Sequence, residues 1–178
     1  MKSLLVVVDF QVDFVCGALG FSGAARLEGP ICAAIASQRQ RGGDVCFTMD
    51  THTEKYLETQ EGRHLPVVHC VRGTEGWALF GRVADLRREE DPVFEKPGFG
   101  SLDLMRFVQA GEYDEVTLVG LVSHICVMTN ALLVKTALPE AQVRVDCACT
   151  DSFDPILHKK ALDVMHALQV ECIHRGAV

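Results

Sequence analysis

The sequence lacks any apolar run long enough to cross a membrane or to act as a secretory signal. The run at residues 4–8 is far too short for either, and an acidic residue follows it at once. We therefore expect a cytoplasmic protein without membrane contact. Positive charge is also scarce, because 17 lysines and arginines stand against 24 acidic residues. The net charge of -7 argues against nucleic acid as a partner and favours a small molecule.

The sequence also lacks linkers, internal repeats and low-complexity segments. A chain of 178 residues without such an interruption suits one hydrophobic core. Because 48% of the residues are apolar, a packed interior is within reach. We predict a single domain over residues 1–178.

Disulfide and zinc-knuckle patterns are missing among the eight cysteines. Most of these cysteines lie inside apolar segments rather than in loops, which favours reduced thiols. The pair Cys147 and Cys149 lacks the spacer of a zinc knuckle, so we interpret both as strand residues. No resolving cysteine stands near Cys126, which argues against a redox role for that thiol.

Apolar, β-branched runs alternate with helical patterns, which is typical of a parallel sheet wrapped by helices. Strands are predicted at residues 4–8, 45–49, 67–71, 116–121, 143–145 and 170–173. Helices are predicted around residues 27–35, after a Ser101 cap, at 127–138 and at 155–168, with short helical turns within 73–91. We predict an α/β fold with three layers, α-β-α, and an open, doubly wound, mainly parallel sheet of about six strands.

Polar residues gather where these strands end. Asp9 follows the first strand, Asp50 and His52 end the second, His69 lies near the end of the third, and Cys126 follows the fourth. Ligands of open α/β sheets bind beyond the carboxyl ends of the strands. We therefore expect these side chains to share one edge of the sheet.

Cys126 stands where an apolar strand gives way, through Gly120, to an apolar helix. Backbone N–H groups at a helix start favour negative charge, so a cysteine there tends towards thiolate. The same groups would hold the oxyanion of an acyl-transfer intermediate. Taken alone, a buried core thiol is the commoner interpretation. The hypothesis of a nucleophile therefore depends on the other residues.

Asp50, His52 and His69 form a second chemical pattern. Asp50 and His52 are two positions apart, so in extended backbone both side chains project to the same side. A lone histidine is more often a core residue, but three ligand-type residues within 20 positions favour a metal site. Two histidines and a carboxylate with open positions suit zinc, iron or manganese.

Five segments, at residues 9–14, 50–52, 69–76, 94–96 and 120–127, occur in the order of known signatures. Together they resemble the isochorismatase-like cysteine hydrolases, and more closely the nicotinamidase branch. The resemblance covers residues 4 to about 155. The metal triplet is the evidence for the branch, because isochorismatases proper are similar in fold and lack it.

The resemblance implies a catalytic triad of Asp9, Lys96 and Cys126. Lys96 would favour the thiolate, and Asp9 would take the thiol proton and return it to the leaving amine. The resemblance also implies a cis peptide between Leu121 and Val122. The amides of Val122 and Cys126 would then form the oxyanion hole.

The resemblance further implies a fourth metal ligand between the second and third ones. Glu58, Glu61 and His64 are the candidates, and we favour Glu61, which precedes a proline and a histidine. We expect zinc, with iron or manganese as alternatives. We also expect a homo-oligomer.

The implied reaction converts nicotinamide, or a similar heteroaromatic amide, to the acid and ammonia through a thioester on Cys126. Phe14, Trp77 and Leu121 would line the substrate. Thr51 and His124 depart from the residues usual in the family, which leaves the substrate open. Two alternatives remain: another small amide, carbamoyl or vinyl-ether substrate, or a non-catalytic binding protein on the same fold.

Overall fold

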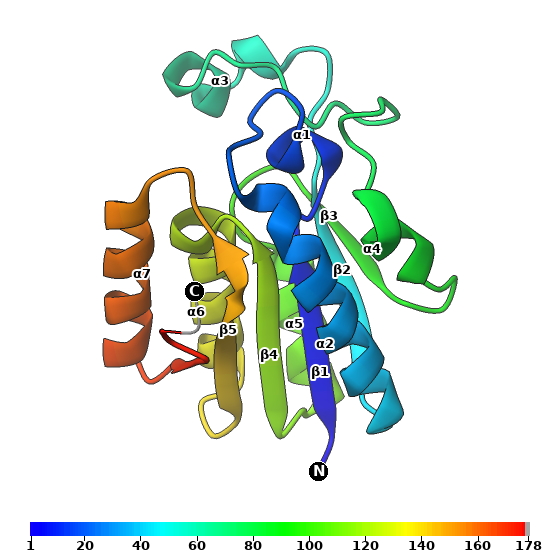
Figure 1. Ribbon diagram of the computed structural model, residues 1–178, viewed down its shortest axis with the longest axis vertical. Coiled ribbons are helices and arrows are strands. Elements are labelled where there is room, and N and C mark those ends of the chain that lie inside the picture. Colours follow the sequence, from blue (N-terminus) through cyan, green and yellow to red (C-terminus); the bar gives the residue numbers. More distant parts are fainter. Residues whose placement is uncertain (177–178) are drawn as a thin grey trace.

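A computed structural model of the chain, which describes residues 1–176, has one six-stranded sheet at its centre (Figure 1). The strands are β1 (Ser3–Val8), β2 (Asp44–Asp50), β3 (Val93–Lys96), β4 (Glu115–Leu121), β5 (Gln142–Asp151) and β6 (Glu171–Ile173). Their order is β3-β2-β1-β4-β5-β6, and every neighbouring pair is parallel. From β1 the chain adds β2 and β3 on one side, and then β4, β5 and β6 on the other side. This confirms the predicted doubly wound α/β fold.

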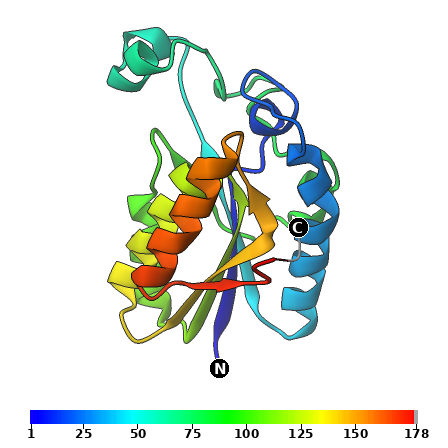
Figure 2. The same cartoon turned by 60° about the vertical axis from the view of Figure 1, so that its left-hand side comes forward.

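Helices cover both faces of the sheet, as Figure 2 shows. One face carries α5 (Leu102–Gly111), α6 (Met128–Ala137) and α7 (Pro155–Ala167), and the other carries α1 (Val12–Val15), α2 (Glu28–Gln40) and α4 (Gly81–Leu86). β1 shows why: Leu4, Val6 and Val8 pack on the first face, and Leu5 and Val7 on the second. Successive strand residues point to opposite faces, so an unbroken apolar strand needs helices on both. The predicted three layers are confirmed.

The predicted helices occur close to their expected positions. Ser101 caps α5, and its hydroxyl accepts a hydrogen bond from the Leu104 amide at 3.1 Å. Pro155 occupies the first turn of α7, where its missing N–H is not needed. Within residues 1–176, no helix combines the length and the apolar character that crossing a membrane requires.

The third strand is Val93–Lys96, and the prediction of a strand at residues 67–71 was wrong. Only Val71 of that segment pairs, in a single bridge to His52, and Val68 is 44% exposed. The true strand pairs with β2, and Phe94 packs against Phe107 with ring centroids 5.2 Å apart. It has only four residues before a proline and a glycine, so its pattern is short and ends in helix- and strand-breaking residues.

β5 is longer than the predicted strand at residues 143–145. It continues through Cys147 and Cys149, both 3% exposed, in agreement with their interpretation as strand residues. The pairing with β4 shifts register between Leu118 and Gly120. This irregularity lets Cys147 pack on one face of the sheet and Cys149 on the other.

Candidate active site

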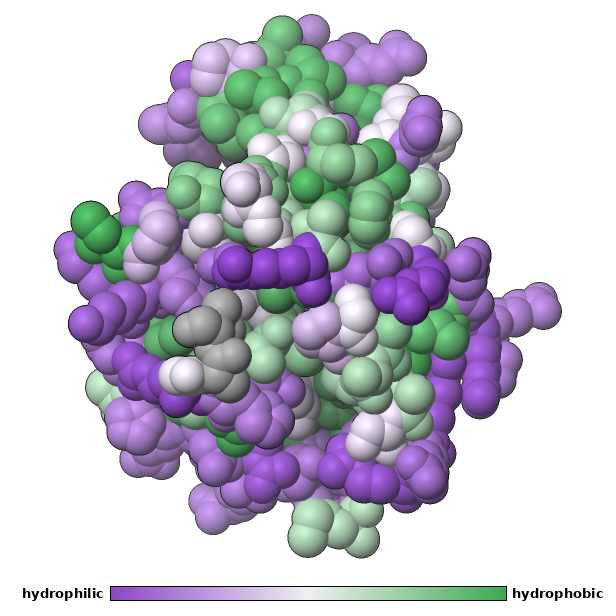
Figure 3. Space-filling model, in the orientation of Figure 1, coloured by the Kyte–Doolittle hydropathy of each residue, from purple (hydrophilic) through white to green (hydrophobic). Residues whose placement is uncertain are grey.

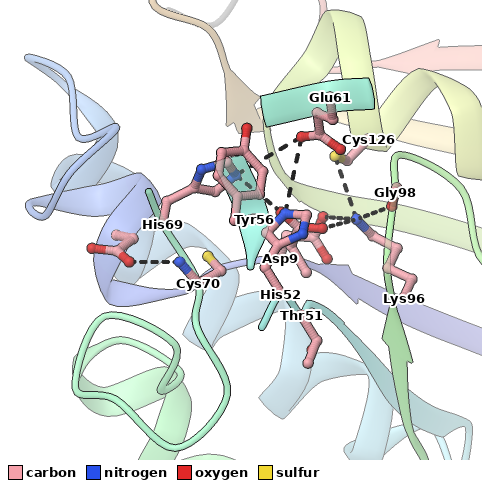
Figure 4. Close-up of polar contacts among 12 residues, drawn as sticks. Asp9, Thr51, His52, Tyr56, Glu61, His69, Cys70, Lys96, Gly98 and Cys126 are labelled. Atoms are coloured by element: carbon pink, nitrogen blue, oxygen red, sulfur yellow. Dashed lines mark hydrogen bonds and ion pairs between the residues drawn. The ribbon is translucent and has the colours of Figure 1, made fainter. Parts of the chain in front are cut away.

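Four polar side chains meet beyond the carboxyl edge of the sheet, and Figure 4 labels three of them, Asp9, Lys96 and Cys126. Asp9 follows β1, Asp50 ends β2, Lys96 ends β3, and Cys126 lies in the π-helical turn η3 (Ser123–Val127) that leads into α6. The Lys96 Nζ atom is 2.7 Å from Asp9 Oδ2, 3.4 Å from Asp50 Oδ1 and 3.5 Å from Cys126 Sγ. The structure thus brings Asp9, Lys96 and Cys126 together around one ammonium group.

Lys96 is a buried cation, with only 1% of its surface exposed. Its ammonium also donates a hydrogen bond to the Gly98 carbonyl at 2.8 Å. Burial by itself lowers the pKa of Lys96, but the attraction of Asp9, Cys126 and Asp50 outweighs burial and raises that pKa. Lys96 therefore stays protonated at neutral pH and offers a fixed positive charge to the sulfur.

The thiol of Cys126 is 5% exposed, and burial raises its pKa well above the usual value although Lys96 opposes this. The expectation of a resting thiolate is therefore not met, because burial outweighs the effect of the helix start.

Burial also raises the pKa of Asp9. Asp9 has φ 46, a left-handed conformation that is uncommon outside glycine, and its Oδ1 accepts a hydrogen bond from Thr48 Oγ1 at 2.6 Å. The resting thiol keeps its proton until a base accepts it.

Asp50, His52, Glu61 and His69 offer ligand atoms that all lie within 4.8 Å of one another. Asp50 Oδ2 is 3.0 Å from His52 Nε2 and 3.3 Å from His69 Nε2. Glu61 Oε1 lies 3.9 Å and 4.0 Å from the same two nitrogens. A tetrahedral metal with bonds of about 2.0–2.1 Å needs ligand atoms roughly 3.3 Å apart. The four residues therefore fit one metal ion.

Hydrogen bonds orient the ligand-type residues. His69 Nδ1 contacts the Val67 carbonyl at 2.7 Å, so this nitrogen carries the proton and Nε2 is free to coordinate. The Tyr56 ring packs on His52 and His69, with centroids 4.6 and 4.8 Å away. Burial opposes ionisation of Asp50, but the contacts with His52, His69 and Lys96 together outweigh burial and lower the pKa of Asp50. Asp50 is therefore an ionised, ready ligand.

The structure distinguishes among the three candidates for the fourth ligand. Glu61, in α3 (Gln60–His64), faces the two histidines. His64 is exposed and its Nδ1 contacts the Gln60 carbonyl at 2.8 Å, and Glu58 is exposed as well. Within residues 1–176, only Glu61 of the three joins the cluster.

Two positioning residues were missed by sequence reasoning. Gln11 holds the Asp50 backbone from both sides: its amide donates to the Asp50 carbonyl at 2.9 Å and accepts from the Asp50 N–H at 2.8 Å. Asn130 donates to the Cys126 carbonyl at 2.8 Å and accepts from the Ser101 N–H at 2.9 Å. Both are buried. The only feature of the sequence that could have pointed to them is an amide side chain beside an otherwise apolar segment.

A cavity of about 380 Å³ opens above these groups. Its lining residues are Phe14, Ala18, Leu19, Gly20, Phe21, Asp50, Glu61, Leu65, His69, Phe99, Val122, Ile125, Cys126 and Phe153. The predicted oxyanion residues Val122 and Cys126 are among them, and the Leu121–Val122 peptide is cis, as expected.

Three pocket residues were predicted, and the structure places only Phe14 on the cavity. Trp77 lies elsewhere, because its indole N–H donates to Thr51 Oγ1 at 2.9 Å and its ring packs on the core. Leu121 is fully buried as a β4 core residue. The prediction that Trp77 and Leu121 line the substrate therefore does not fit this cavity, which neither residue lines.

The chain is similar to known proteins along almost its whole length. Residues 3–175 match the isochorismatase domain. A Bacillus subtilis (strain 168) protein described as uncharacterized isochorismatase family protein PncA is 29% identical over 143 residues, which cover 74% of this chain and 78% of that protein. The structure of nicotinamidase/pyrazinamidase PncA from Bacillus subtilis matches with a TM-score of 0.85 and 26% identity, over 97% of this chain and 99% of that one.

A further structure, pyrazinamidase of Pyrococcus horikoshii in complex with zinc, has a TM-score of 0.85 and 23% identity, over 97% of this chain and 99% of that one. At this identity the likeness shows the shared fold. Taken together with the domain match, these similarities agree with the resemblance found in the sequence. The chain therefore belongs to the isochorismatase family and is a hydrolase that resembles the nicotinamidase and pyrazinamidase branch.

Proposed function

We propose that the chain is a metal-containing cysteine amidohydrolase that converts nicotinamide, or a similar heteroaromatic amide, to the acid and ammonia. The observation that carries the proposal is the buried Lys96, which contacts Asp9 and also Asp50 and Cys126, two residues that line the cavity. The same cavity meets the metal-type cluster through Asp50, Glu61 and His69. The amidase names of several relatives support an amide substrate.

The proposed first half-reaction forms a thioester. Asp9 accepts the proton of the Cys126 thiol as the sulfur attacks the amide carbonyl carbon. The backbone N–H groups of Val122 and Cys126 would stabilise the oxyanion, and the charge of Lys96 would stabilise the developing thiolate. The tetrahedral adduct collapses when Asp9 returns the proton to the leaving nitrogen, and ammonia departs.

The second half-reaction restores the enzyme. Asp9, again a carboxylate, takes a proton from a water molecule that attacks the thioester carbonyl carbon. The carbon–sulfur bond breaks, the acid leaves, and Asp9 gives the proton back to the sulfur. Asp9 accepts and returns a proton in both half-reactions. Its fixed position beside Lys96 therefore matters more for catalysis than the exact value of its pKa.

Asp50, His52, Glu61 and His69 would hold a divalent transition metal, for which we propose zinc. Two imidazoles and two carboxylates form a donor set typical of zinc, iron or manganese. The zinc in the Pyrococcus horikoshii relative supports this choice. A bound metal supplies an electron-pair acceptor for a ring nitrogen. The chain itself would fix the distance between the metal and the Cys126 thiol, because Lys96 contacts both the ligand residue Asp50 and the sulfur.

Purified protein is expected to hold about one transition metal per chain, because the described part of the chain, residues 1–176, provides one four-residue cluster. His52→Ala should lose the metal, since Nε2 of His52 lies 3.0 Å from Asp50 Oδ2. Elemental analysis after gel filtration measures the content. His166→Ala, on an exposed position of α7, serves as the matched control. Metal-free wild type with activity that chelators leave unchanged would contradict the proposed metal.

Substrate preference tests the proposed function as a whole. Nicotinamide should release ammonia much faster than benzamide, because only nicotinamide has a ring nitrogen and two fixed points orient its carbonyl. Ammonia release by the metal-loaded enzyme, measured at matched concentrations, gives the ratio. Equal rates, or hydrolysis of an aliphatic amide alone, would indicate another isochorismatase-family reaction. No hydrolysis of any amide would favour the non-catalytic alternative.

A further inference from the structure

The cavity is larger than a single-ring amide requires. A cavity of about 150 Å³ holds one benzene ring, whereas this cavity measures about 380 Å³. A carboxamide group adds only three non-hydrogen atoms to a ring. The volume also lies within the range of about 300–1,000 Å³ that is typical of sites for larger ligands. Space therefore remains beyond the reacting ring.

The residues around the cavity differ in depth. Asp50, His69 and Cys126 are at most 5% exposed, so the reactive groups lie at the base. Leu65 and Phe99 are 38% and 50% exposed. These two, with Phe21 and Phe153, form an apolar mouth that we call the outer subsite. Figure 3 shows apolar surface in the region of α3, the helix that Leu65 follows.

Phe153 is fixed in place although 59% of it is exposed. Its ring meets those of His124 and Phe21 edge-on, with centroid distances of 5.2 and 6.4 Å. His124 is itself held by a hydrogen bond of 2.8 Å between its Nδ1 and the buried Ser152 hydroxyl. An exposed phenylalanine with this support forms a preorganised wall for an aromatic ligand.

The charges around the cavity favour a neutral ligand. Asp50 and Glu61 line it, and among residues 1–176 no lysine or arginine does. Lys96, which contacts the lining residue Cys126, is already shared by Asp9, Asp50 and the Gly98 carbonyl. The proposed metal would offset the charges of Asp50 and Glu61 at the base, but a negative group at the mouth would lose water without a cationic side chain to pair with. An apolar group would instead be removed from water by Phe21, Phe99 and Phe153.

We propose that the outer subsite binds a neutral, apolar group that the amide substrate carries beyond its reacting ring. This inference rests on the proposed function and narrows its substrate class to heteroaromatic amides with an apolar extension. It also disfavours amides that carry a negative charge beyond the reacting ring.

Three related amides test this inference. Nicotinamide is the reference, 5-phenylnicotinamide adds an apolar ring, and 5-carboxynicotinamide adds a negative charge. Position 5 is meta to both the carboxamide and the ring nitrogen, so its substituent points away from both anchors. For the metal-loaded wild type we expect a KM about tenfold lower for the phenyl compound than for nicotinamide, because an aromatic group is partly buried. The carboxylate compound should have a KM at least about tenfold higher than nicotinamide.

Phe153→Ala should remove most of the preference for the phenyl compound over nicotinamide. Ile156→Ala, which deletes an apolar side chain that is 67% exposed and outside the cavity lining, should keep the preference. A wild type that hydrolyses nicotinamide but gives no advantage to the phenyl compound would overturn the outer subsite. The apolar mouth would then be a contact surface for another protein chain.

Binding measurements separate this inference from the proposed function. Calorimetric titration of the metal-loaded Cys126→Ala variant gives Kd values for the same three amides without turnover. A Kd about tenfold lower for the phenyl compound supports the outer subsite, and equal values overturn it. If wild type hydrolyses none of the amides, the proposed function fails, and the Kd values still decide whether the subsite exists.

Discussion

The Cys126→Ala variant is expected to lose amide hydrolysis by about four orders of magnitude or more, because it lacks the only atom proposed to attack the carbonyl. The fold should survive. The substitution removes one sulfur atom from the cavity wall, and the Lys96 contacts to Asp9, Asp50 and Gly98 all remain. Ammonia release under saturating nicotinamide measures the loss, and far-ultraviolet circular dichroism checks the fold.

Cys147→Ala is the matched control for that experiment. Cys147 is also a buried thiol, 3% exposed, but it lies in β5 and does not line the cavity. Its replacement should lower the melting temperature slightly through lost packing and leave turnover close to wild type. Near wild-type hydrolysis by Cys126→Ala would rule out covalent catalysis by this cysteine.

Asp9→Asn and Lys96→Ala should each reduce the maximal rate by about three orders of magnitude. Asparagine cannot accept the thiol proton, although it nearly preserves the shape of Asp9. Alanine removes the cation beside Cys126 and leaves Asp9 and Asp50 as neighbouring buried carboxylates. Lys96→Ala should therefore also lower the melting temperature clearly, whereas Asp9→Asn should change it less.

The double variant shows whether the two residues act together. If Asp9 moves the proton only because Lys96 fixes it at 2.7 Å, the two losses should be far from additive. Single-turnover rates of the four proteins give the coupling. Asp103→Asn, at an exposed position of α5, serves as the control. Modest losses that simply add would show that Asp9 and Lys96 are only neighbours.

Most of the site residues that the sequence could predict are those that lie at the ends of clearly patterned strands. Asp9 and Asp50 follow clear apolar runs, so the rule for parallel sheets placed them at one edge. Lys96 ends β3, which is too short and too close to Pro97 and Gly98 to have a strand pattern. Its role was implied only by resemblance. A strand is predicted from the regular repeat of apolar residues along it, and a strand of four residues is too short to show such a repeat.

The rest of the site depends on tertiary contacts that no local pattern describes. Glu61 reaches the metal cluster because the segment around α3 folds over the carboxyl edge of the sheet, as Figure 1 shows. Trp77 has the residue type of a pocket wall, yet its hydrogen bond to Thr51 holds it elsewhere. Phe153, which was not predicted, lines the cavity because the end of β5 places it there. The homo-oligomer and the cytoplasmic location stay predictions.

Trapping of the acyl-enzyme tests the central claim most directly. Metal-loaded wild type would be mixed with nicotinamide, quenched in acid during turnover, digested and analysed by mass spectrometry. Asp9 serves both half-reactions, so the Asp9→Asn protein would be quenched in parallel as a control for adducts that arise without turnover. We expect a nicotinoyl group on the peptide that contains Cys126, and on no other cysteine peptide. Turnover without an adduct on Cys126, or with the adduct on another residue, would contradict the proposed mechanism.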